Sequence, residues 1–186
     1  MRTTKPIDLS AVTSKEMNKI RNGLALYTQI QNDIRDTPSF REVFAKFYFV
    51  PKTSITLNDQ ELFFNKMFAN HPSDPLDFAK SLKDDGAQKF FLSFATKAVH
   101  TFNNDSPIYD SVVVSYLHQQ RNAHMSYTDA ISNWIKLKDW YETFLQTEEA
   151  DEWVAWFDNN FPSYTWISKV KKIDFIIYSF AAVRKK

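Results

Sequence analysis

Two glycines in 186 residues are the feature that most constrains this fold. Tight β-hairpins use turns with positive φ angles, which glycine adopts most readily, so a multi-stranded antiparallel sheet normally carries several glycines. The same scarcity excludes the glycine-rich phosphate loops of nucleotide-binding proteins. Gly86 follows Asp85, and we interpret this pair as the end of a helix rather than as a hairpin turn. The sequence therefore predicts an all-α protein.

Apolar residues recur at intervals of three or four along most of the chain, which is the period of an amphipathic helix. The first such stripe follows a capping box made of Thr13 and Glu16. The second helix is expected to start at Thr37-Pro38-Ser39 with Ser39 as its cap, and the next two are expected to be capped by Asn58 and Asp74. The expected helical or acidic segments cover residues 13–34, 37–50, 58–70, 74–86, 87–102, 110–117, 126–145, 148–158 and 163–183. We expect eight or nine helices.

The segment 111–117 is the one place where propensity favours a strand, because three valines follow one another at Val112, Val113 and Val114. A single strand would have no partner in this chain, and Asp110 with Ser111 is a good helix cap, so we expect a helix there. We expect one domain over residues 1–186, with a flexible N-terminal segment over 1–10. The weakest internal divisions are 51–58 and 103–107.

Composition narrows the classes of function. The 23 Lys and Arg residues against 22 Asp and Glu give a net charge of +1, which excludes a histone-like polyanion binder and an acidic disordered tail. The absence of cysteine excludes a disulfide framework, a thiolate zinc site, an iron–sulfur cluster and a cysteine nucleophile. The four histidines do not have the spacing of a helical zinc site. We therefore expect no metal and no cofactor.

The chain carries no signal for secretion or for a membrane span. No apolar segment follows the basic N-terminus, and no run approaches the roughly 18 apolar residues that would cross a bilayer. The cytoplasm is therefore the expected compartment.

Basic residues suggest two places for contacts with nucleic acid. Lys97 and His100 are three apart and would share one face of a helix. Lys169 and Lys172 belong to a cationic edge on the last helix. These four residues are the candidate phosphate contacts. The alternative for the last helix is ordinary stabilisation, because Lys and Arg near a helix C-terminus complement the helix dipole.

Asp110 is the candidate catalytic residue. It follows a polar break and Pro107, and it stands where a helix is expected to begin. The positive end of a helix dipole stabilises a carboxylate at that position. The alternative is that Asp110 is only an N-cap, whose side chain accepts backbone N–H groups of the first turn. A third possibility is a hydrolase that uses Asp110 with His100.

The segment Pro107-Ile108-Tyr109-Asp110-Ser111-Val112-Val113 resembles the catalytic-aspartate segment of the helix-hairpin-helix DNA glycosylases. In that superfamily a helix leads through a loop to a Pro-Val-Asp-Thr-His-Val-like run, whose Asp stabilises charge on the sugar as the base departs. The resemblance implies that Asp110 matches this Asp. The segment is also similar to uncharacterised bacterial proteins with a Ser-Lys, His-Phe and Pro-Ile-Tyr-Asp-Ser pattern. The matching residues are Thr96, Lys97, His100, Phe102 and Pro107–Ser111.

The chain departs from the glycosylase pattern in one important part. No glycine follows Gly86, so the glycine-containing hairpin that donates backbone N–H groups to DNA is missing. The resemblance then implies a degenerate glycosylase scaffold, with weak nucleic-acid binding and no catalysis. The alternative function is a non-enzymatic protein-interaction module that uses exposed aromatic residues. The candidate partner surface consists of Trp153, Trp156 and Trp166.

Overall fold

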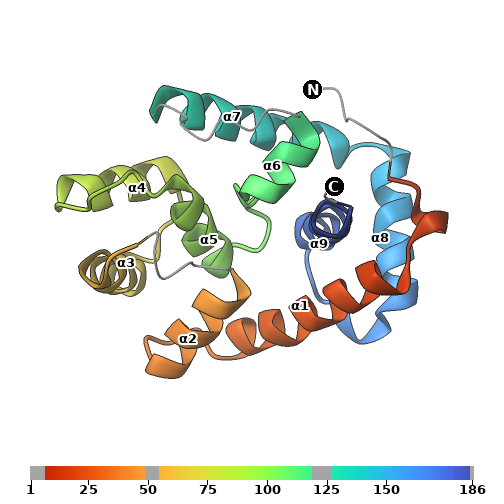
Figure 1. Cartoon of the computed structure of the whole chain (residues 1–186), viewed down its shortest axis with the longest axis horizontal. Coiled ribbons are helices and arrows are strands. Elements are labelled where there is room, and N and C mark those ends of the chain that lie inside the picture. Colours follow the sequence, from red (N-terminus) through yellow and green to blue (C-terminus); the bar gives the residue numbers. More distant parts are fainter. Residues whose placement is uncertain (1–6, 49–54, 119–126, 185–186) are drawn as a thin grey trace. The chain divides into compact units, whose positions relative to one another are not determined.

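The computed structural model describes residues 7–48, 55–118 and 127–184. In these ranges the chain forms nine α-helices, two short 3-10 helices and no strand (Figure 1), which confirms the all-α prediction. The α-helices are α1 (Ser14–Asn32), α2 (Pro38–Phe47), α3 (Leu57–Asn70), α4 (Pro75–Asp84), α5 (Leu92–Phe102), α6 (Ser111–His118), α7 (Tyr127–Phe144), α8 (Glu148–Asn160) and α9 (Lys169–Val183). The 3-10 helices are η1 (Leu9–Ala11) and η2 (Pro162–Tyr164).

The helices form two compact units. Unit 2 is one continuous segment, residues 22–103, and unit 1 combines residues 1–21 with residues 104–186. The second boundary falls at the edge of the polar break at 103–107, one of the two divisions that the sequence suggested. The first boundary lies inside α1, where the helical pattern continues without interruption.

The start of α1 follows the predicted capping box. The backbone N–H of Thr13 donates to Oε2 of Glu16 at 2.8 Å, and the Thr13 hydroxyl donates to the same oxygen. Of the predicted stripe, four side chains are at most 1% exposed: Ile20, Leu24, Tyr27 and Ile30. The period of the stripe therefore predicted which face of α1 is buried.

The caps of the next two helices each lie two residues before the predicted cap. Thr37 caps α2 by accepting the N–H of Phe40, so Ser39 is not the cap. Thr56 caps α3 by accepting the N–H of Asp59, so Asn58 is not the cap either. Both threonines have extended backbones, which lets the hydroxyl reach the N–H three residues ahead. At α4 the predicted cap is confirmed, because Asp74 accepts from the first turn.

Helix α5 begins at Leu92 rather than at Ala87. The residues before it form a loop whose backbone groups are bound by two side chains. Asp59 accepts the N–H of Gln88 at 3.2 Å, and Nζ of Lys83 donates to the carbonyl groups of Ala87 and Gln88 at 3.0 Å. These side chains supply hydrogen-bond partners to backbone groups of residues 87 and 88 that a helix would otherwise have paired.

The prediction that α9 begins near Ser163 is also wrong. Pro162–Tyr164 forms the 3-10 helix η2, and α9 starts at Lys169. Ser168 caps it by accepting the N–H of Lys171 at 3.2 Å.

The segment 111–117 is helical, as predicted. At the N-terminus, Ile7 is buried and the side chain of Asp8 caps η1, so part of the segment 1–10 belongs to the described structure.

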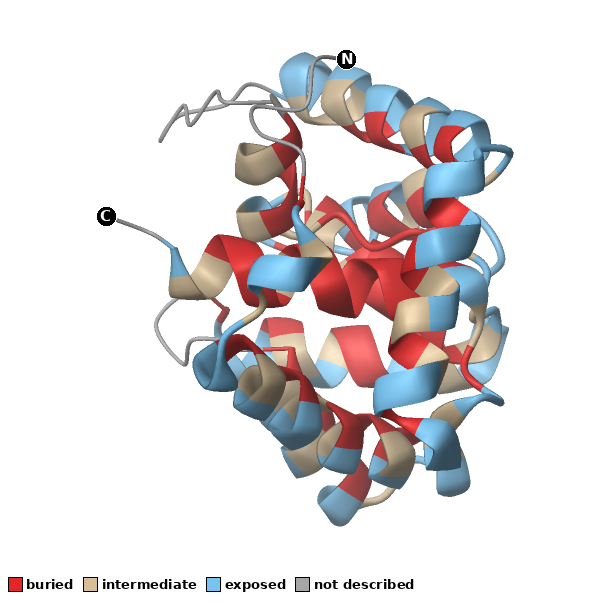
Figure 2. Ribbon diagram, turned by 90° about the vertical axis from the view of Figure 1, so that its right-hand side faces the viewer, coloured by how far each residue is buried: buried red, intermediate tan, exposed pale blue. Residues whose placement is uncertain are grey.

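Each unit has its own core. In unit 1, α9 packs against α6 and α8, and every residue from 170 to 177 is buried. In unit 2, α4 packs against α3 and α5, and α5 is buried on nearly all sides. Figure 2 shows buried and exposed positions alternating along most other helices. Helices α9 and α5 therefore form the centres of unit 1 and unit 2.

Candidate functional site

Unit 2 contains a cleft of about 460 Å³ that α2 and α3 line from two sides. Ile55, just before α3, and Phe94, on α5, complete the lining. The lining is mainly apolar, with charged side chains among it. Ligand sites in proteins commonly have volumes of about 300–1,000 Å³ and the same mixture of apolar lining and a few polar groups.

Four phenylalanines form the apolar part of this lining. Phe44, Phe63 and Phe64 are buried and Phe94 is half-buried. The ring centre of Phe63 lies 5.8 Å from that of Phe44, 5.1 Å from that of Phe64 and 6.0 Å from that of Phe94. Aromatic pairs attract one another at these separations. The rings therefore hold each other in place, and the apolar surface is formed before any ligand arrives.

The spacing of residues on the two helices explains the composition of the cleft. On α2, Arg41, Phe44 and Ala45 are three and four positions apart, so they share one face. On α3, Glu61 and Phe64 share a face in the same way. Each helix therefore places a charged residue and an aromatic residue on the face that lines the cleft.

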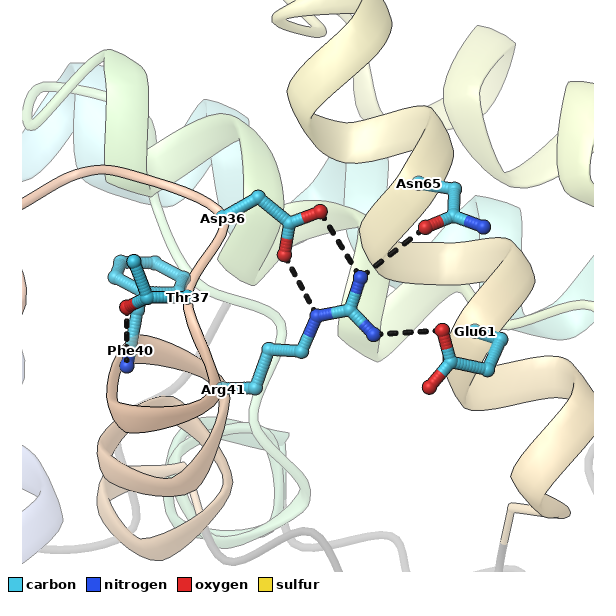
Figure 3. A network of polar contacts seen from close by, with 6 residues as sticks. All are labelled: Asp36, Thr37, Phe40, Arg41, Glu61 and Asn65. Carbon is cyan, nitrogen blue, oxygen red and sulfur yellow. Dashed lines mark hydrogen bonds and ion pairs between the residues drawn. The ribbon is translucent and has the colours of Figure 1, made fainter.

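Arg41 connects the two helices at the edge of the cleft (Figure 3). Its Nε and Nη2 atoms donate to the two oxygens of Asp36 at 2.6 and 2.9 Å. Its Nη1 atom donates to Glu61 at 2.7 Å, and Nη2 also donates to Asn65 at 3.1 Å. The guanidinium lies 5.0 Å from the ring centre of Phe64. Arg41 is therefore fixed by both helices and by the aromatic lining.

The ionisation of this network follows from its hydrogen bonds. The bond from Arg41 lowers the pKa of Asp36 below its usual value, although partial burial opposes this. The bond to Asp36 raises the pKa of Arg41, and the bond to Glu61 adds to the effect. Asp36 is ionised at neutral pH and Arg41 is always protonated, so the contact between them is a charge-assisted, bidentate pair.

Lys97 and His100, the first two nucleic-acid candidates, are both buried in unit 2. Lys97 is 6% exposed, and its Nζ donates to the Tyr48 carbonyl at 3.4 Å and to the Ser93 hydroxyl at 3.3 Å. His100 is fully buried, with Nε2 3.1 Å from the Tyr27 hydroxyl. Phosphates are bound at surfaces, so in this conformation neither side chain reaches one. Their role in nucleic-acid binding stays a prediction.

Asp110 lies in unit 1 at the start of α6. Its Oδ1 accepts the N–H of Val112 at 2.7 Å, and its carbonyl accepts the N–H of Val114 at 2.8 Å. These bonds are typical of a helix N-cap. His100 belongs to unit 2 and Asp110 to unit 1, so the hydrolase alternative that pairs them stays a prediction.

Asp110 is half-buried, and its charge acts on Tyr141 in the interior of unit 1. Burial raises the pKa of Tyr141 well above its usual value, and the charges of Asp174 and Asp110 raise it further. The Tyr141 hydroxyl is buried without a hydrogen-bond partner among the described residues. Asp174 itself is paired with Lys171 at 2.6 Å. Asp110 therefore lies near a buried polar group.

Lys169 and Lys172 both pair with carboxylates of α8. Nζ of Lys169 lies 2.8 Å from Oδ1 of Asp151 and is exposed. Nζ of Lys172 lies 2.7 Å from Oδ1 of Asp158 and donates to the Thr165 carbonyl at 3.0 Å. Lys172 is 4% exposed. The acidic helix α8 therefore neutralises both predicted basic contacts, and only Lys169 is on the surface.

The three tryptophans of the predicted partner surface differ in burial. Trp153 is buried, with its ring centre 4.9 Å from that of Phe144. Trp156 is half-buried, and Trp166 is 48% exposed. Only Trp166 therefore presents a large aromatic surface. Use of these residues by a partner stays a prediction.

The described residues form neither a metal-binding cluster nor a membrane-spanning helix. Among the described residues, no group of three or more His, Asp or Glu side chains is placed to hold a metal ion. His124 lies outside the described ranges, as does the side chain of His118. No helix in the described part of the chain has the length and apolar character needed to cross a membrane.

Sequence reasoning missed the cleft, because it treated the phenylalanines of α2 and α3 as ordinary core residues. One signal was present. Arg41 stands between Phe40 and Phe44 on a short helix, and Glu61 stands just before Phe63-Phe64 on the next one.

Comparison with known proteins adds no identification. No family model matches the chain, and neither the curated proteins nor the solved structures include one with significant similarity to it.

Proposed function

We propose that this chain is a non-catalytic protein-interaction module, and that it binds an apolar segment of another protein in the cleft between α2 and α3. The observation that carries the proposal is the cleft itself. It has a volume of about 460 Å³, and its aromatic lining is held in place by contacts between the rings. A site of this volume accommodates one or two large side chains.

The physical support comes from the way such interfaces gain affinity. A few apolar or aromatic side chains that enter a preformed pocket contribute most of the binding free energy, and charged residues around them exclude water and set orientation. The cleft has both parts: the phenylalanines below and Arg41, Glu42, Lys46 and Glu61 at its edge. Because the lining is already packed, little entropy is lost in ordering it when the ligand binds.

The resemblance to DNA glycosylases fits this proposal as a retained scaffold without the chemistry. The support is that Asp110 is engaged as a helix cap, and that Lys97, His100 and Lys172 are buried. Lys169 remains the one accessible member of the predicted contacts, and it is paired with Asp151. Weak nucleic-acid binding therefore has less support than protein binding.

The test is a peptide selection with a variant that fills the cleft. Peptides are selected from a displayed random library on the full chain, and the affinity of the enriched peptides is measured by fluorescence anisotropy. Ala45 lines the cleft on α2 and is half-buried. Ala45→Phe should reduce the affinity by about tenfold or more, because the new ring occupies the space of the ligand.

The matched control is Ala155→Phe on α8, an exposed position in unit 1, which should leave the affinity unchanged. The proposal is wrong if no peptide is enriched. It is equally wrong if the enriched peptides bind the Ala45→Phe variant as tightly as they bind the unchanged chain.

A further inference from the structure

Building on the proposed function, we infer that the ligand segment carries a positive charge next to its apolar side chain, and that Glu61 is the residue that selects it. The inference names the class of partner, a basic and aromatic or aliphatic peptide segment. It is argued from the charges at the edge of the cleft.

The first step is the charge balance of the Arg41 network. One guanidinium is shared between two carboxylates, Asp36 and Glu61. Four of the five N–H groups of Arg41 are used by Asp36, Glu61 and Asn65. The positive charge is therefore fully engaged, and the three charged side chains together carry a net charge of −1.

The second step is the accessibility of that negative charge. The side chain of Asp36 is 34% exposed and that of Arg41 is 23% exposed, whereas the side chain of Glu61 is 65% exposed. Only one oxygen of Glu61 accepts from Arg41, and Figure 3 shows the second oxygen directed away from the guanidinium. Glu61 therefore presents an oriented carboxylate oxygen to solvent at the edge of the cleft.

The third step is that the other charges at the edge balance. Glu42 and Lys46 are both exposed and stand four positions apart on α2, a spacing at which opposite charges are neighbours. Their sum is zero. The four charged side chains that line the cleft sum to zero, and Asp36, which pairs with Arg41 but does not line the cleft, brings the sum to −1. The exposed oxygen of Glu61 presents this excess at the edge, so a cationic group beside the apolar anchor is the complementary ligand chemistry.

Arg41 restricts the position of the Glu61 carboxylate. Asp36 holds the guanidinium from the α2 side, and the ring of Phe64 lies 5.0 Å beneath it. Glu61 is therefore held at a fixed point above the aromatic lining. A lysine or arginine of the ligand can therefore pair with Glu61 while its neighbouring apolar side chain occupies the space below.

Two small probes that differ only in charge test the inference. Tryptamine is an aromatic cation, and indole-3-propionate is an aromatic anion of nearly the same shape. Each is titrated into the ¹⁵N-labelled full chain, and the amide shifts of residues that line the cleft are followed. Tryptamine should bind about two- to fivefold more tightly, the factor that an exposed ion pair supplies. Added salt should reduce the difference.

Glu61→Gln should abolish the preference for the cation, because it removes the excess negative charge and keeps the shape of the side chain. The matched control is Glu149→Gln, the same change at an exposed position on α8 in unit 1, which should leave the preference intact. Circular dichroism of both variants verifies that the helices are retained.

The possible outcomes separate this inference from the proposed function. If both probes shift the cleft resonances with equal affinity, or if the anion binds more tightly, the charge selection is wrong and the cleft remains a binding site. If neither probe shifts those resonances, the inferred charge selection of an aromatic ligand is wrong, and the proposed function is decided separately by the peptide selection. A preference that persists in Glu61→Gln would show that another residue carries the selection.

Discussion

Nε of Arg184 lies 2.8 Å from Oε1 of Glu16, so the residue that follows α9 is bound to the first turn of α1. Glu16 is only 1% exposed, and its other oxygen accepts from Thr13. Arg184 also donates to the carbonyl of Ala11 at 3.0 Å and lies 4.2 Å from the ring centre of Phe180. One carboxylate thus caps a helix and joins the two ends of unit 1.

This arrangement predicts a loss of stability in acid that depends on Glu16. Burial acts to raise the pKa of Glu16, but the hydrogen bonds from Thr13 and Arg184 outweigh it and lower the pKa to about 2. Because the folded-state pKa is depressed from 4.5, the stabilisation is complete above about pH 4.5 and is lost as the pH falls toward 2. We expect about 2–3 kcal/mol from this group.

Urea unfolding of Glu16→Gln and of the unchanged chain, measured over the same pH range, tests this prediction. The two stabilities should differ near neutral pH and converge in acid. Glu149→Gln, an exposed control, should follow the unchanged chain throughout. A Glu16→Gln variant with the same acid sensitivity as the unchanged chain would refute the assignment.

Asp110 gives a second prediction, because a cap and a catalytic carboxylate respond differently to the same substitutions. As a cap that accepts the N–H of Val112, Asp110→Ala should lower the free energy of unfolding by about 0.5–2 kcal/mol. Asp110→Asn keeps an oxygen acceptor and should leave stability nearly unchanged. Thermal melts of both variants measure this difference.

A base-excision assay on damaged duplexes, run beside those melts, tests the glycosylase alternative. Asn would preserve the shape of the side chain and remove the charge that a catalytic carboxylate supplies. We expect no excision activity from the unchanged chain. An Asp110→Asn variant that melts normally but loses a measurable activity would establish catalysis and overturn the cap interpretation.

The two lysines of α9 give a third prediction, because one is buried and the other is exposed. Lys172→Ala leaves Asp158 without its partner in a largely buried pair and should destabilise the fold by up to about 3–5 kcal/mol. Lys169→Ala removes an exposed pair and should cost about 0–1 kcal/mol. Chemical denaturation measures both. Equal effects would contradict the difference in burial.

The same variant of Lys169 tests nucleic-acid binding. Any affinity for a labelled duplex should be weak and should fall steeply between low and physiological salt, because it would depend on a few phosphate contacts. Lys169→Ala should weaken it further. Tight binding that is insensitive to salt would reveal a recognition element outside the predicted contacts.

Much of the fold could be predicted from local chemistry. The apolar stripe of α1 and the caps at Thr13 and Asp74 act within one or two turns, so the sequence contains all the information they need. The first residues of α3 and α9 were harder to predict from the sequence. Thr56 precedes Asn58, and both residue types cap helices, so only the observed backbone decides between them.

The candidate site was harder still, because burial depends on contacts between distant segments. Lys97 and His100 are polar and share a helix face, a pattern that usually indicates solvent exposure. Helix α5 is instead enclosed on nearly all sides, and Tyr48 and Tyr27, far away in sequence, supply the hydrogen-bond partners. No periodicity within α5 could have revealed those partners.

The division of the chain also has a consequence for the order of assembly. Unit 2 is made of one uninterrupted stretch, whereas unit 1 needs both the beginning and the end of the chain. During synthesis, residues 22–103 leave the ribosome before α9 does, so all of unit 2 is present first. Glu16, in the first turn of α1, can pair with Arg184 only after α9 has been synthesised. We therefore expect unit 2 to fold before unit 1, whose two chain segments are joined by the pairing of Glu16 with Arg184.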